Sequence, residues 1–327
     1  FVILKFIYNV NVIKMQNNQK IIAIFGGTGF LGKYLMRQLT KLDYRLKIAT
    51  RNPYLKGYLK PLGNPGQIEL FKTNIFNTKD VKRVLKDCDY AINLCGILFE
   101  KRKEKFNQVH SQFPLLLSSL CNEIGIKKLI HISALGVKEN HPSQYMQSKL
   151  EGEKNIENIF KPSVILRPSV VFGPEDKFFN NFASLAQFFP ALPLIGGGKT
   201  KFAPIYCGDV AKAVVKSLDL NNSKCQIYEL GGPVNYSFKE LMEIMLKEIK
   251  KKRLLINIPF KFAKFQSYFL QIFPKPLITP DQVEMLKHNN IISGNYPTLN
   301  DLGVSGTPIQ SILPKYIYRF REGGQFG

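Results

Sequence analysis

Closely spaced cysteine pairs are absent from this chain of 327 residues. The four histidines do not cluster with the cysteines either. This distribution argues against a disulfide framework or a zinc site, and it is typical of a reducing compartment. We therefore expect no bound metal. The five cysteines are Cys88, Cys95, Cys121, Cys207 and Cys225.

Long apolar runs and acidic residues are also scarce. No apolar run approaches the ~18–20 residues of a membrane-spanning helix, which argues against an integral membrane protein. Asp and Glu number 24 against 46 Lys and Arg, and the net charge of +22 favours anionic partners such as phosphates, acidic lipids or nucleic acid. The basic runs at 101–103 and 250–253 are short. We interpret them as solvated surface, with a membrane surface as the alternative, and expect no nucleic-acid partner.

Hydrophobic residues make up 45% of the chain and aromatic residues 12%, a composition that excludes disorder for most of it. The length predicts about two domains, or one larger core with an appended lobe. Residue 1 is Phe and the first methionine is Met15. We therefore expect residues 1–19 to be a disordered or artefactual extension.

Apolar runs alternate with amphipathic segments through the first ~170 residues, which predicts an α/β fold with a Rossmann-type, doubly wound parallel sheet. The predicted strands span residues 21–25, 46–50, 68–72, 90–94, 128–132, 163–167 and 226–230. The predicted helices span residues 30–42, 81–86, 113–124, 144–160, 210–218 and 237–252.

A glycine-rich turn lies between the first predicted strand and the first predicted helix. Gly26, Gly29 and Gly32 have the spacing G-x-x-G-x-x-G. The first permits a tight turn, the second removes a Cβ that would block a pyrophosphate, and the third allows close helix–strand packing. The helix N-terminus would then bind the phosphates. The residues expected at the cofactor are Gly26, Thr28, Gly29, Phe30, Leu31 and Gly32.

This turn predicts an NAD(P)-binding domain over residues 20–175, and residues 176–327 are then a smaller lobe for substrate or a partner, interleaved with the core. The second strand ends in Thr50-Arg51-Asn52, without the acidic residue that would bind the ribose 2′-OH of NAD. Arg51 could instead pair with a 2′-phosphate. We therefore favour NADP(H) over NAD(H).

These features and several downstream motifs resemble the extended and atypical short-chain dehydrogenase/reductase superfamily, from Lys20 onward. The motifs are Asn74-Ile75, Cys95-Gly96, Tyr145-Met146-Gln147-Ser148-Lys149, Leu166-Arg167-Pro168 and Gly208-Asp209-Val210-Ala211. The resemblance implies that Asn74 and Ile75 lie near the adenine. It also implies that Cys95, Gly96, Tyr145, Lys149 and Pro168 contribute to the cofactor site.

Tyr145 and Lys149 are four residues apart, so both lie on one face of a predicted helix. An ammonium beside the phenol would favour the phenolate, and Tyr145 could then act as general acid or base. The superfamily's third catalytic group is a Ser or Thr after the fifth strand. Ser133 ends that strand, whereas the usual positions hold Ala134 and Leu135. Two alternatives stay open: Ser133 is the third catalytic residue, or it only caps the strand and the triad is incomplete.

Within the superfamily the chain most resembles the nucleotide-binding accessory subunit of respiratory complex I (NADH:ubiquinone oxidoreductase) and its bacterial relatives. The strings that carry this resemblance are Glu175-Asp176-Lys177-Phe178, Asn181-Phe182 and Ile278-Thr279-Pro280-Asp281-Gln282-Val283-Glu284. The resemblance implies a non-catalytic NADPH-holding protein whose partners are complex I or quinone-biosynthesis subunits. Its expected place is peripheral, on the cytoplasmic side of a bacterial inner membrane or the matrix side of a mitochondrial one.

The segment 254–277 is rich in Phe and Lys. Phe262, Phe265, Phe269 and Phe273 recur at helical spacing, and Pro259 should precede the helix. One interpretation is a helix that faces the core. The other is a helix at a membrane interface or partner subunit, with its lysines toward acidic headgroups.

The sequence thus favours an NADP(H)-binding subunit with a structural nucleotide. The alternative is an active oxidoreductase or epimerase that acts on a nucleotide sugar, isoprenoid or quinone precursor, with Tyr145 as proton donor or acceptor and Lys149 supporting it. A nucleotide-sensing regulator is a third, less favoured hypothesis.

Overall fold

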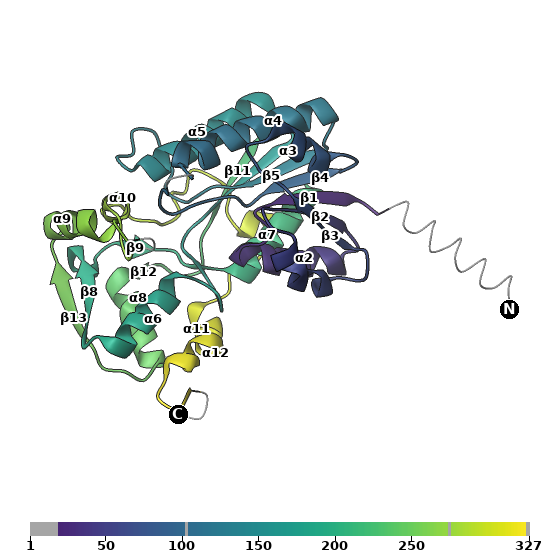
Figure 1. The fold of residues 1–327 in the computed structure, drawn as a ribbon. Helices are drawn as coiled ribbons and strands as arrows, with labels where there is room; N and C mark the ends of the chain where they lie inside the picture. The colour runs from purple at the N-terminus through teal and green to yellow at the C-terminus, as the bar shows by residue number, and fades with distance from the viewer. Residues whose placement is uncertain (1–18, 102–103, 274–275, 325–327) are drawn as a thin grey trace, which may run out of the picture.

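The computed structural model describes residues 19–101, 104–273 and 276–324 (Figure 1). The expected N-terminal extension lies almost entirely outside the described residues. A seven-stranded sheet, parallel throughout, has the strand order β11-β6-β5-β4-β1-β2-β3. The predicted Rossmann-type fold is therefore confirmed. Its strands are β1 (Ile21–Phe25), β2 (Arg45–Thr50), β3 (Ile68–Lys72), β4 (Tyr90–Asn93), β5 (Lys128–Ile132), β6 (Ser163–Pro168) and β11 (Gln226–Leu230).

Helices cover both faces of this sheet (Figure 1). In β1, Ile22 and Ile24 pack in the core beneath α2 and α7, whereas Ala23 and Phe25 pack beneath α3, α4 and α5. Both faces of the strand are thus buried, which explains why its sequence is continuously apolar. The covering helices are α2 (Phe30–Lys41), α3 (Thr78–Leu85), α4 (Phe113–Ile124), α5 (Gln144–Ile159) and α7 (Cys207–Asp219). Two further helical segments are η1 (Tyr54–Leu62) and η2 (Asn107–Gln112).

A second core holds together the C-terminal lobe. Buried side chains from α6, α8 and α11 meet there, among them Phe179, Phe238, Leu241 and Ile309. The helices of this lobe are α6 (Phe178–Phe188), α8 (Phe238–Glu248), α9 (Phe260–Leu270), α10 (Pro280–Met285), α11 (Ile309–Ile312) and α12 (Pro314–Ile317). Its strands are β7 (Val171–Phe172), β8 (Ala191–Ile195), β9 (Lys201–Phe202), β10 (Ile205–Tyr206), β12 (Tyr236–Ser237) and β13 (Leu254–Ile258). Short helical turns are η3 (Gly196–Gly198), η4 (Asn300–Leu302) and η5 (Tyr318–Phe320).

Helix boundaries differ from the predictions where capping side chains set them. The predicted helix at 81–86 begins earlier, at Thr78, because the Asn77 side chain accepts a hydrogen bond from the N–H of Asp80. The predicted helix at 237–252 begins after Ser237, which forms a capping box with Glu240, and it ends at Glu248. Caps satisfy backbone donors that periodicity alone does not register.

The α9 helix begins after Pro259, as predicted, but most of its aromatic side chains do not face the core. Its buried residues are Ala263 and Ser267. The exposed fractions of Phe262, Phe265 and Phe269 are 58%, 63% and 59%. The core-facing interpretation of this Phe stripe is therefore wrong. No helix in the described part of the chain combines the length and apolar character needed to cross a membrane.

Candidate functional site

The glycine turn joins β1 to α2 with the strained backbone that its sequence predicts. Gly26 has a φ of 78°, and a Cβ there would lie 2.8 Å from the backbone N of Cys95. A Cβ at Gly32 would lie 2.0 Å from the carbonyl oxygen of Gly27. Gly32 therefore allows helix α2 to pack closely against the backbone of the glycine turn. Gly29, the N-cap of α2, provides no side-chain acceptor, and the first turn of the helix holds no acidic residue. This positive helix end therefore fits an anionic phosphate.

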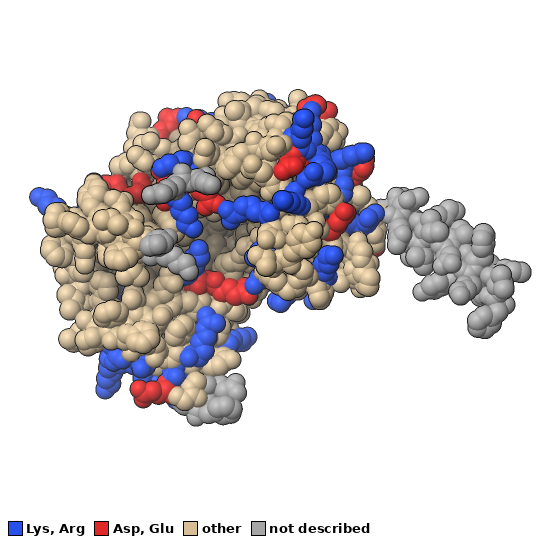
Figure 2. Space-filling view, in the orientation of Figure 1, with Lys and Arg blue, Asp and Glu red and all other residues tan. Residues whose placement is uncertain are grey.

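The site lies where the strand order reverses. β1 is flanked by β4 on one side and β2 on the other, and ligands of such sheets bind at this switch point beside the carboxyl ends of the strands. Cys95 and Gly96 follow β4, and a Cβ on Gly96 would lie 3.5 Å from the Nζ of Lys149. The structure thus brings Lys149 beside the loop that contacts Gly26. Figure 2 shows a hollow between the sheet and the C-terminal lobe, with basic side chains gathered along one rim.

Tyr145 and Lys149 both come from α5 and are both buried. The Nζ of Lys149 donates to the carbonyl oxygen of Ile132 at 3.0 Å. Burial lowers the pKa of Lys149 to about 8. Burial, with a smaller contribution from Asp281, raises the pKa of Tyr145 to about 12. In the protein alone, burial therefore favours the protonated phenol over the expected phenolate.

Aromatic side chains enclose Tyr145. Its ring centroid lies 5.7 Å from that of Phe106 and 5.2 Å from that of His110. His110 is fully buried, accepts from the N–H of Ile97 at 3.0 Å, and has a pKa lowered to about 2 by burial. A neutral imidazole therefore fixes the loop after β4. Sequence reasoning missed Phe106 and His110, because neither belongs to a motif and the turn of chain before α4 has no clear periodicity.

Two buried polar atoms at the end of β5 have no hydrogen-bond partner among the described residues, namely Ser133 Oγ and His131 Nε2. The other ring nitrogen of His131, Nδ1, lies 3.1 Å from the Asn93 amide nitrogen. Buried polar groups are seldom left unpaired, so these two atoms fit a ligand beside β5. Neither Ala134 nor Leu135 offers a hydroxyl. His131 and Asn93 were not predicted, although a His inside an apolar strand was the available signal.

Arg51 follows β2 directly and is exposed, with its side chain 85% accessible. Its guanidinium forms an ion pair with the carboxylate of Glu104, which the sequence did not indicate. Asn74 is exposed and Ile75 half-buried after β3. The Asn74 side chain accepts from the N–H of Phe76 at 3.1 Å, so it stabilises the turn in which it lies. These residues lie beyond the carboxyl ends of β2 and β3, at the same edge of the sheet as the glycine turn.

Pro168 and its neighbour Arg167 end β6. The Pro168 carbonyl accepts from the N–H of Leu135 at 2.9 Å, which ties β6 to the loop after β5. Arg167 is almost fully buried and donates three hydrogen bonds to the carboxylate of Glu153 on α5. Its guanidinium also lies 4.7 Å from the ring centroid of Tyr296. Arg167 therefore anchors α5 to the sheet.

This arrangement of strand, glycine turn, helix and Tyr–Lys pair defines a dinucleotide-binding class of protein. The sequence model of the NAD dependent epimerase/dehydratase family matches residues 22–231, and the chain belongs to that family.

Curated relatives carry the similarity across most of the chain. NADH dehydrogenase (ubiquinone) 1 alpha subcomplex subunit 9, mitochondrial, from Arabidopsis thaliana is 31% identical over 93% of this chain and 79% of its own length. The mouse protein of the same name is 28% identical over 89% and 78%. The 40 kDa subunit of NADH-ubiquinone oxidoreductase from Neurospora crassa is 26% identical over 93% and 80%.

Solved structures confirm the fold. The crystal structure of gox2253 superposes with a TM-score of 0.71 at 17% identity and covers 94% of this chain and 99% of that one. DesIV, a dTDP-glucose 4,6-dehydratase from Streptomyces venezuelae with NAD and TYD bound, has a TM-score of 0.70 at 16% identity over 92% and 96%. At these identities the likeness concerns the fold alone.

Proposed function

We propose that this protein holds NADP(H) as a structural nucleotide and acts as an accessory subunit of complex I, or of a related quinone-linked assembly. The observation that carries the proposal is the packing of Tyr145. The residue is 8% exposed and its ring is enclosed by Phe106 and His110, and the positions where an extended reductase carries its hydroxyl hold Ala134 and Leu135. Such a site favours retention of a nucleotide over turnover of a substrate. The similarity to complex I subunits supports the choice of partner.

The nucleotide would lie across the switch point, and nicotinamide, when bound, supplies hydride chemistry. The pyrophosphate would lie at Gly26, Thr28, Gly29, Phe30, Leu31 and Gly32. The adenine would lie toward Asn74 and Ile75, and the nicotinamide ribose toward Tyr145, Lys149, Cys95, Gly96 and Pro168. Nucleotide bound only to the folded state stabilises that state by mass action.

We propose that Arg51 binds the 2′-phosphate of NADP(H). The phosphate would then replace Glu104 as the ion-pair partner of Arg51. Arg51→Asp should weaken NADP(H) far more than NAD(H), measured as Kd by calorimetry. Equal weakening of both nucleotides would remove the assignment.

The exposed aromatic side chains of α9 are the proposed contact with a partner subunit or an acidic membrane surface. Three Phe side chains on this helix are more than half exposed, and the same helix carries Lys261 and Lys264. The location follows from the partner: the matrix side in mitochondria, or the cytoplasmic side of a bacterial inner membrane.

Gentle purification from native membranes tests the proposal as a whole. We expect complex I subunits in the same particle and stoichiometric, slowly exchanging NADP(H). A lone protein with freely exchanging nucleotide would contradict it.

Co-sedimentation with phosphatidylcholine vesicles, with and without phosphatidylglycerol, tests the membrane contact. Phe265→Ser/Phe269→Ser should reduce sedimentation, whereas Tyr54→Ser/Leu55→Ser, a still more exposed pair on η1, should not.

A second candidate function is an active NAD(P)-dependent oxidoreductase or epimerase. The observation that favours it is that Tyr145 and Lys149 are both present, four residues apart on one face of α5. Substrate-dependent change in NADPH absorbance, lost in Tyr145→Phe, would establish it. If no turnover is seen with nucleotide sugars, isoprenoid precursors or quinone precursors, the result would favour the structural role of the nucleotide.

A further inference from the structure

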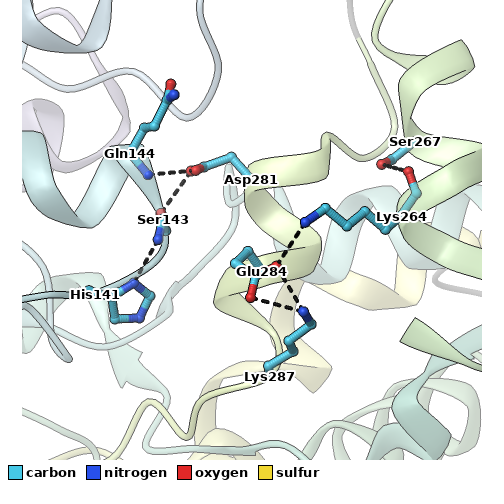
Figure 3. Close-up of polar contacts among 8 residues, drawn as sticks. All are labelled: His141, Ser143, Gln144, Lys264, Ser267, Asp281, Glu284 and Lys287. Atoms are coloured by element: carbon cyan, nitrogen blue, oxygen red, sulfur yellow. Dashed lines mark hydrogen bonds and ion pairs between the residues drawn. The ribbon is translucent and has the colours of Figure 1, made fainter. Parts of the chain in front are cut away.

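The short helix α10 lies between α9 and the N-terminus of α5, far from α5 in sequence (Figures 1 and 3). Thr279 and Gln282 form a capping box at its start, and Pro280 occupies its first turn. These local features stabilise a helix of only six residues. Its side chains therefore project from a fixed backbone toward both neighbours.

Asp281 of α10 caps α5. Its Oδ1 accepts from the N–H of Gln144 at 2.7 Å, and its Oδ2 accepts from the hydroxyl of Ser143 at 2.8 Å and the N–H of Tyr145 at 3.3 Å. The Ser143 oxygen in turn accepts from the N–H of Met146 at 3.3 Å. A carboxylate and a hydroxyl thus satisfy the first three N–H groups of α5, where a negative charge is also favoured by the helix dipole.

Other residues of α10 reach the surroundings of Tyr145. Met285 packs against the apolar cluster that contains Tyr145 and Phe106. The Gln282 amide donates to the carbonyl oxygen of Leu98, in the loop after β4, at 3.3 Å. Helix α10 therefore contacts three parts of the structure: helix α5, the apolar side chains around Tyr145, and the loop after β4.

The other side of α10 is fixed to α9. Glu284 pairs with Lys264 of α9 at 3.3 Å and with Lys287 at 2.8 Å (Figure 3). Val283 is fully buried in a small core with Ala263 of α9. The helix with the exposed aromatic side chains is therefore connected, through six residues, to the N-terminus of α5.

We propose that Asp281 is a positioning residue, through which the C-terminal lobe holds Tyr145 in place for the nicotinamide half of the bound nucleotide. This inference rests on the proposed function, in which Tyr145 lies at the nicotinamide ribose. Asp281 contacts neither the glycine turn nor Arg51, so it acts on one half of the nucleotide site only.

The test is Asp281→Asn in the full chain. An amide keeps one acceptor oxygen and turns an NH2 group toward the remaining donors, so the cap is broken at constant shape. We expect the Kd for NADPH to rise about fivefold to tenfold, as loss of a charged helix cap predicts. The Kd for 2′,5′-ADP, which lacks the nicotinamide half, should stay unchanged. Asp301→Asn is the matched control, because Asp301 caps the turn at Thr298 and has no contact with α5.

The outcomes separate the inference from the proposed function. Equal loss of NADPH and 2′,5′-ADP, or no loss of either, would overturn the positioning role. A wild-type chain that binds neither ligand would overturn the proposed function instead. If Asp281→Asn does not fold, Ser143→Ala removes one of the three hydrogen bonds to Asp281 and also the one that Ser143 accepts from the N–H of Met146. A selective loss of affinity for NADPH of about twofold to threefold is then expected. Equal affinities in that variant and wild type would then overturn the inference.

Discussion

Helices α5 and α9 both combine aromatic side chains with lysines, yet their surroundings are opposite. On α5, Tyr145 is 8% exposed and Lys149 3%, and the helix is joined to β6 by a buried ion pair. On α9, Phe265 and Phe269 are 63% and 59% exposed and contact each other on the surface. The same residue types are therefore fixed in place in one region and available for contact in the other. Residue composition alone does not distinguish the two, whereas burial does.

The largest effect should come from the buried pair between α5 and β6. Glu153→Gln leaves Arg167 charged and buried without its carboxylate, which should cost about 3–5 kcal/mol of unfolding free energy. Urea denaturation measures this loss. The matched control is Glu123→Gln, whose carboxylate pairs with Lys82 on the surface and should contribute less than about 1 kcal/mol. Similar losses in both variants would remove the contrast between buried and exposed charge.

A smaller effect of opposite sign is expected at Lys149. Its pKa is about 8 in the folded protein against 10.5 for an ordinary lysine, so the unfolded chain binds more protons between these values and stability rises with pH across that window. Lys149→Met removes the buried ammonium and should stabilise the nucleotide-free protein by about 1–2 kcal/mol at pH 7. The gain should vanish above pH 10.5. Urea denaturation at both pH values measures it, and a variant less stable than wild type at pH 7 would contradict the assignment.

Sequence reasoning predicted the sheet well because its signals are local. The strands at Ile21–Phe25, Ile68–Lys72 and Lys128–Ile132 lie at the predicted residues, since each is a short, mainly apolar run bounded by polar or glycine residues. Gly26 and the Tyr–Lys helix were found for the same reason. The prediction that the chain divides near residue 175 remains a prediction.

Other features could not be predicted because they depend on tertiary contacts. Glu104 meets Arg51 across 53 positions, and Asp281 meets Gln144 across 137. No local pattern encodes such pairs. Helix α10 is too short for periodicity, although its capping residues Thr279 and Gln282 were a usable signal. The exposure of the α9 aromatics was left open by a helical spacing that suits either environment.

A modest effect on nucleotide affinity is expected at the ion pair of Arg51 and Glu104, which lies beside the parallel sheet. Glu104→Gln removes the carboxylate that now occupies Arg51, so a 2′-phosphate should bind about twofold to fivefold more tightly, as expected for an exposed ion pair. Calorimetry with NADPH and NADH measures the change, and NADH should gain little. Glu139→Gln, which removes an exposed pair with Lys154, is the control. Equal gains for both nucleotides would show that Glu104 acts on overall charge alone.

The smallest effect on the free energy of unfolding should come from the exposed aromatic side chains of α9, and this prediction tests the comparison most directly. Phe269→Ala should change the free energy of unfolding by less than about 0.5 kcal/mol, because the ring is mostly in water already. Phe113→Ala, at 1% exposure against Phe25, should cost about 3–5 kcal/mol. Urea denaturation of the isolated protein compares them. A large loss at Phe269 would mean that its ring supports the fold, and the surface on α9 would then have to be assigned to internal packing rather than to contact with a partner.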